Sequence, residues 1–98
     1  MKLSDFKMIQ QFGQANKTQV VLDFGKYHLS VITGGYGNDT APYEIAVVEL
    51  KNGAGNGFVR LPGITGPDDD VRGHMTKDDV DAVLVKMYTI TSAEPVQI

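Results

Sequence analysis

Three consecutive carboxylates, Asp68-Asp69-Asp70, are the residues of this chain that most directly suggest a metal site. A calcium-binding loop alternates its ligands with spacer residues and closes on a bidentate glutamate. Here the carboxylates are adjacent, so they point in different directions, and no glutamate closes the loop. The spacing therefore predicts a solvated acidic loop without a metal ion.

A histidine and an aspartate are the candidates for acid–base chemistry. The β-prone runs 18–24 and 27–33 flank Gly25-Lys26, and a two-residue turn there places Asp23 directly across from His28. A carboxylate can orient an imidazole as a general base. The sequence places no nucleophile for such a base to serve, so we interpret the pair as a surface cross-strand ion pair.

The remaining histidine, His74, lies just before a predicted C-terminal helix. It is interpreted as part of the start of that helix. Two histidines this far apart in the chain are a poor basis for a metal site, because such sites need three or four converging ligands.

A glycine-rich loop, Gly34–Pro42, contains Gly-Gly-x-Gly, as some phosphate-binding loops do. Those loops run from a strand into a helix whose N-terminus faces the phosphate. This one joins two predicted strands, so nucleotide binding is not expected. Tyr36 within it is an aromatic side chain suited to contact with a partner, and the alternative, that it folds back onto the sheet, stays open.

Composition excludes several classes of function. The 98 residues are expected to form a single domain, 1–98. The net charge is −3 and the nine Lys and Arg residues are scattered, so no nucleic-acid-binding stripe is expected. There is no cysteine, no apolar run approaches a membrane span, and charges in the first seven residues argue against a secretory signal. We expect a cytoplasmic protein and, because the core is modest, a possible homo-oligomer.

Two elements have clear sequence signals. In the hairpin, side chains two apart share a face, which gathers an apolar set on one side: Val20, Leu22, Phe24, Tyr27, Leu29 and Val31. Residues 76–90 predict a helix, since Thr76 and Asp79 form a capping box. An apolar stripe follows at helical spacing, consisting of Val80, Val83, Leu84 and Met87.

The other elements are predicted from shorter patterns. We expect a short helix over 4–12 between Ser4 as N-cap and Gly13 as C-cap, and a strand over 43–50 covered on both faces. A short strand over 58–61 and a long loop over 62–73 follow. Residues 91–98 are expected to be a loose tail, although Val96 and Ile98 could add an edge strand. The predicted fold class is α+β: a three- to four-stranded antiparallel sheet with a short N-terminal helix and a C-terminal helix packed on one face.

The block 43–87 resembles small accessory proteins of tailed phages. The features are the strand Tyr43-Glu44-Ile45-Ala46-Val47-Val48, an Asn-Gly turn, a short strand, a Gly/Asp loop, and Val71-Arg72-Gly73-His74-Met75-Thr76 opening a helix. The layout is also similar to that of some compact anti-CRISPR inhibitors. The resemblance implies a protein that binds and blocks a host protein and has no catalytic residues. This chain lacks the strong acidity of the DNA-mimicking inhibitors.

These observations predict a non-enzymatic protein-interaction module, which could be a phage-encoded inhibitor or modulator of a host protein or defence system. Neither a cofactor nor a metal is expected. One alternative is a small-ligand-binding protein or minor enzyme that uses Asp23 and His28, or His74. Another is a structural virion component with contacts through the sheet edges. Binding is expected in the two long loops, at Tyr36, Asn38, Asp39, Asp68, Asp69, Asp70 and Arg72.

Overall fold

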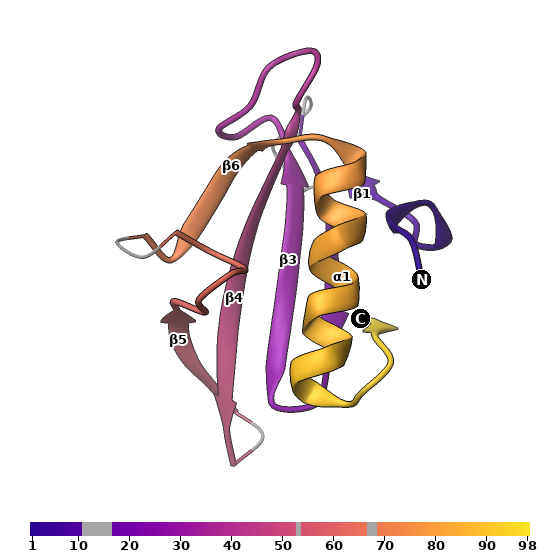
Figure 1. Ribbon diagram of the computed structural model, residues 1–98. Helices are drawn as coiled ribbons and strands as arrows, with labels where there is room; N and C mark the ends of the chain where they lie inside the picture. Colours follow the sequence, from indigo (N-terminus) through magenta and orange to yellow (C-terminus); the bar gives the residue numbers. More distant parts are fainter. Residues whose placement is uncertain (11–16, 53, 67–68) are drawn as a thin grey trace.

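One antiparallel sheet with a single α-helix across one face makes up the fold, as seen in a computed structural model that describes residues 1–10, 17–52, 54–66 and 69–98 (Figure 1). The strands are β1 (Ile9–Gln10), β2 (Thr18–Asp23), β3 (Tyr27–Thr33), β4 (Tyr43–Lys51), β5 (Ala54–Val59), β6 (Val71–Met75) and β7 (Val96–Gln97). The helices are the 3-10 helix η1 (Leu3–Asp5) and α1 (Lys77–Thr91).

The sheet has five positions across its width, because two strands share each edge. The order is β1-β2-β3-β4-β5, with β7 also pairing with β2 and β6 also pairing with β4. β1 lies beside the first residues of β2, and β7 lies beside the last. In the same way β6 lies beside the first half of β4, and β5 beside the second half.

The central hairpin has the predicted register. Val20 pairs with Val31, Leu22 with Leu29, and Asp23 with His28. Gly25 at the turn has φ +91°, a backbone conformation that glycine adopts without steric strain. Val20 and Leu22 of β2 and Leu29 and Val31 of β3 are buried on one face, as the alternation predicts.

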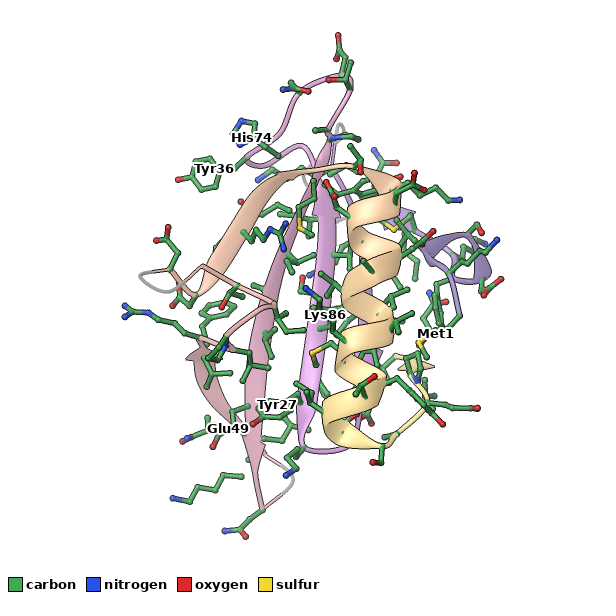
Figure 2. The ribbon with its side chains drawn as sticks, in the orientation of Figure 1. Met1, Tyr27, Tyr36, Glu49, His74 and Lys86 are labelled. Atoms are coloured by element: carbon green, nitrogen blue, oxygen red, sulfur yellow. The ribbon has the colours of Figure 1, made fainter. Side chains whose placement is uncertain are left out.

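Helix α1 covers that face and confirms the predicted stripe. All four of its predicted core residues are at most 1% exposed: Val80, Val83, Leu84 and Met87. They belong to one buried cluster with the inward residues of β2, β3 and β4. Ile64, from the segment between β5 and β6, joins this cluster, and the Lys86 ammonium donates to the Gly63 carbonyl at 3.0 Å. Figure 2 shows Lys86 on α1.

The helix predicted over 4–12 is wrong for the part that the structure describes. Leu3 is buried, and its N–H donates to Asp81 Oδ1 on α1 at 2.6 Å. Ile9 then pairs with Gln19 at the edge of the sheet. Hydrogen bonds from the backbone of this segment to α1 and β2 therefore override its weak helical pattern of apolar residues. Phe12 and the expected C-cap Gly13 lie outside the described residues.

The edge beyond β4 holds two strands where one short strand was expected. β5 starts four residues before the predicted strand over 58–61, and β6 starts at Val71, inside the segment predicted as a loop over 62–73. β4 itself is covered on one face only, since Ile45 and Val47 are buried while Ala46 and Val48 are half-buried. The prediction of a strand covered on both faces was therefore wrong.

The C-terminal tail is held to the sheet. Val96 pairs with Asp23, Gln97 pairs with Leu22, and the Ile98 N–H donates to the Val21 carbonyl at 3.0 Å. The Gln97 side chain also bonds both the N–H and the carbonyl of Lys7, at 3.1 and 2.7 Å. The expectation of a loose tail was wrong, and the alternative of an edge strand is confirmed.

The predicted fold class is therefore corrected. Over the residues that the structure describes, the sheet is antiparallel with seven strands and there is one α-helix, whereas a sheet of three to four strands with two helices was predicted. The missed strands are short or rich in glycine, so they carry no alternating pattern of their own. Within the described residues, no helix is both long and apolar enough to cross a membrane.

The start of α1 gives a prediction on pH. The Thr76 hydroxyl accepts from the Asp79 N–H at 3.1 Å, and the Thr76 N–H donates to the Asp79 carboxylate at 2.9 Å. The hydrogen bonds from the Thr76 backbone and side chain, with Arg72 nearby, lower the pKa of Asp79 below its ordinary value of 3.8. Because the pKa of Asp79 is lower in the folded than in the unfolded protein, its ionised carboxylate stabilises the fold at pH values above the unfolded pKa. This stabilisation is lost as pH falls through the folded pKa.

Asp79→Asn is therefore expected to lower the free energy of unfolding at pH 7. The difference from the parent protein should shrink as pH falls below 3.8. Urea denaturation of both proteins at a series of pH values measures this difference. A gap that stays constant down to acid pH would show that the charge of Asp79 does not stabilise the helix.

Candidate protein-interaction surface

The glycine-rich loop between β3 and β4 is held in one shape by a single side chain. Asn38 Oδ1 accepts from the Thr40 N–H at 3.0 Å, the Thr40 hydroxyl at 2.9 Å and the Ala41 N–H at 2.8 Å. The Asn38 N–H donates to the Ala41 carbonyl at 3.1 Å. Asn38, predicted as a binding residue, thus uses its side-chain oxygen to shape the loop.

This loop presents Tyr36 to solvent. The Tyr36 side chain is 70% exposed, so the alternative that it folds back onto the sheet is wrong. Its backbone is held at both polar groups: the N–H donates to Glu44 Oε1 at 3.3 Å, and the carbonyl accepts from the His74 N–H at 2.7 Å. Figure 2 shows the side chains of Tyr36 and His74 close to each other at the same end of the molecule.

Gly73 allows β6 to approach this loop. A Cβ atom at Gly73 would lie 2.5 Å from both the Cβ and the carbonyl oxygen of Tyr36. Such distances are far below van der Waals contact, so residue 73 must be glycine for the two segments to meet as they do. The local sequence gives no sign that residue 73 must be glycine, because the atoms that require it belong to a loop distant in the sequence.

His74 has a strained backbone. Its φ is +53°, in the left-handed region, where a residue with a Cβ is about 1–2 kcal/mol less stable than in its preferred conformation. The hydrogen bond to Tyr36 and the pairing of Met75 with Tyr43 hold it there. Such strain accumulates at functional positions. The sequence interpretation placed His74 at the start of the helix, with a small-ligand or catalytic role as an alternative, whereas the structure places it in β6.

A shallow hollow of about 230 Å³ lies in the same loop, lined by Gly34, Gly35, Gly37, Asn38, Asp39 and Pro42. Asp39, one of these lining residues, is exposed. A Cβ at Gly37 would come within 2.8 Å of the backbone of Ala41 and Pro42, so the tight return of the loop requires glycine there. We refer to Tyr36, Asn38, Asp39, Glu44 and His74 together as the loop end.

The acidic loop before β6 does not join the loop end. Asp69 is exposed and Asp70 is half-buried, and both precede β6, whereas His74 lies near its far end, about 10 Å along the strand. Arg72 directs Nη1 to the Ile64 carbonyl at 3.5 Å, which ties it to the segment before β6. Asp68 lies outside the described residues. Among the residues described, no group of three or more carboxylates and histidines converges as a metal site would.

The Asp23–His28 pair lies elsewhere, near the turn of the β2–β3 hairpin. His28 Nε2 is 3.7 Å from Asp23 Oδ1, and the same oxygen accepts the Gly25 N–H at 2.8 Å. The two residues are cross-strand neighbours, as predicted. His28 pairs with Val48 and Met75 pairs with Tyr43, so the two histidines are separated by roughly 17 Å along β4. The structure therefore does not bring them to one site.

The loop end thus combines an exposed aromatic ring, a strained histidine and an exposed carboxylate on a backbone that internal hydrogen bonds hold in place. Comparisons of the chain with protein-family models, with curated proteins and with solved structures found no match.

Proposed function

We propose that this chain is a non-enzymatic protein-interaction module that binds its partner through the loop end. The observation that carries the proposal is the exposure of the Tyr36 ring on a loop fixed at Asn38, Glu44 and His74. Tyrosine is enriched in protein interfaces, and a residue whose backbone is already fixed loses less conformational entropy on binding.

The resemblance to tailed-phage accessory proteins suggests the class of partner, a protein of a bacterial host whose activity is blocked when the loop end is occupied. Binding would then take place in the host cytoplasm. His74 beside the ring, and the exposed Asp39 of the same loop, would supply polar contacts at the rim, as in interfaces with an aromatic centre.

A pull-down from bacterial lysate with substituted proteins tests the proposal. We expect the parent protein to recover one stoichiometric host protein, and Tyr36→Ala to bind the purified partner at least tenfold more weakly, since interface tyrosines commonly contribute about 2 kcal/mol. His74→Gly should fold with similar stability, because glycine removes the left-handed strain, and should also bind more weakly. Isothermal titration calorimetry measures both affinities.

Tyr88→Ala is the matched control. Tyr88 is 42% exposed on α1, away from the loop end, so its removal should leave the affinity unchanged. Equal losses for Tyr36→Ala and Tyr88→Ala would contradict binding through the loop end. If the parent protein recovers no stoichiometric partner from the lysate, the proposal fails as a whole.

A further inference from the structure

The face of the sheet opposite α1 is not covered by any described element. Residues paired directly across neighbouring strands share a face, which assigns three rows to this open face. One row runs Asp23, His28, Val48 and Phe58; a second runs Val21, Ser30, Ala46 and Val71; a third runs Ile9, Gln19, Ile32 and Glu44. Val96 pairs with Asp23 and extends the first row to the other edge of the sheet.

Much of this open face is apolar. Three apolar side chains on it are more than half exposed: Ile9 and Val96 on one edge of the sheet and Phe58 on the other. Val21, Ile32, Ala46, Val48 and Val71 between them are half-buried. Exposed apolar surface that reaches from edge to edge of a sheet is unusual on a monomer and marks an interaction site.

The polar side chains of the open face bond within the same chain. Gln19 Nε2 donates to the Ser30 hydroxyl at 2.9 Å. Asp23 accepts the Gly25 N–H and lies 3.7 Å from His28, and Glu44 accepts the Tyr36 N–H. A polar group that already has a partner can be buried at small cost in free energy.

The charged residues occupy the two outer rows, whereas the middle row is uncharged. The middle row can therefore be buried at the centre of an interface without removing a charge from water. The size of the face also suits a dimer. Five strand positions about 4.8 Å apart and three rows about 7 Å apart span roughly 24 by 20 Å. Side chains make the surface uneven, so its accessible area is larger than this flat area. It is of the order of the 800 Å² that each partner contributes to a standard interface.

We propose that the open face binds the open face of a second copy of this chain, forming a symmetric dimer with the two helices on the outside. The middle row then lies at the centre, where the small side chains of Ser30 and Ala46 allow two sheets to pack at the usual spacing of about 10 Å. The same patch on both copies makes the interface self-complementary and closed. Of the loop end, only Glu44 also lies on the open face. The dimer contact does not use Tyr36, so the inference does not rest on the proposed function.

Sedimentation equilibrium of the full chain tests the dimer. At about 100 µM, where a complex with a micromolar Kd is fully formed, we expect twice the monomer mass of 10.6 kDa. Phe58→Asp and Val96→Asp, on opposite edges of the open face, should each raise the dimer Kd at least tenfold, because each places a charge against an apolar surface. Circular dichroism checks that both variants stay folded.

Val85→Asp is the matched control, because Val85 is 54% exposed on α1 and lies outside the open face. It should leave the dimer intact. A parent protein that is monomeric at that concentration would overturn the proposal. So would a dimer weakened by Phe58→Asp but not by Val96→Asp, since that pattern indicates pairing through the edge of β5 alone.

Discussion

Leu84→Ala is expected to lower the free energy of unfolding by about 3 kcal/mol, because it leaves a cavity beneath the only α-helix of the described chain. Leu84 is fully buried in the cluster that joins α1 to Leu22 and Leu29 of the central hairpin. In a domain of this size such a loss should lower Tm by more than about 10 °C. Thermal and urea denaturation followed by circular dichroism measure both quantities.

Val85→Ala is the control for this variant. Val85 is the next residue of the same helix and is exposed, so its truncation should change the free energy of unfolding by less than about 0.5 kcal/mol. If the two substitutions have equal effects, α1 does not pack on the sheet through the face described above.

Gly73→Ala is expected to lower the free energy of unfolding by about 2 kcal/mol and to separate β6 from the Tyr36 loop. The added Cβ would lie 2.5 Å from the Tyr36 carbonyl oxygen, which is backbone and cannot be moved by a rotamer change. The His74 N–H would lose its acceptor, so its hydrogen exchange should become faster. Amide exchange by NMR and urea denaturation test the two effects.

Gly55→Ala provides the matched comparison. At Gly55 the nearest atom to an added Cβ is Val48 Cγ1 at 3.7 Å, an ordinary contact, so the substitution should be close to neutral. Equal exchange rates at His74 in the parent protein and in Gly73→Ala would show that the two segments are not in contact. Because Gly73→Ala disturbs the backbone that supports Tyr36, it should also lower the affinity of the loop end for any partner.

The sequence by itself determined the central hairpin and the helix that covers it. A two-residue turn at Gly25-Lys26 sets the register, and alternation then assigns Leu22 and Leu29 to the buried face. The capping box and the spacing of Val80 to Met87 likewise locate α1. These signals are local, since each depends on residues that lie close together in the sequence. That is why the hairpin and the helix could be predicted.

Only the tertiary structure decided the edges of the sheet. β1 and β7 have two residues each, and they become strands because β2 offers free backbone groups at either end. β5 is rich in glycine and β6 is short, and both pair along the one edge of β4 that β3 leaves open. Backbone hydrogen bonding with a distant partner leaves no pattern in the side chains of such segments.

The candidate site was predicted in part. Glycine content and an exposed aromatic indicated the loop of Tyr36, Asn38 and Asp39, but not that Asn38 shapes the loop or that His74 holds it. Tyr36 and His74 lie far apart in the chain, and their contact depends on β4 pairing with both β3 and β6. Local sequence determines which backbone conformations a segment prefers. Which distant segments meet depends on how the whole chain buries its apolar surface and satisfies its backbone, and that only the folded structure decides.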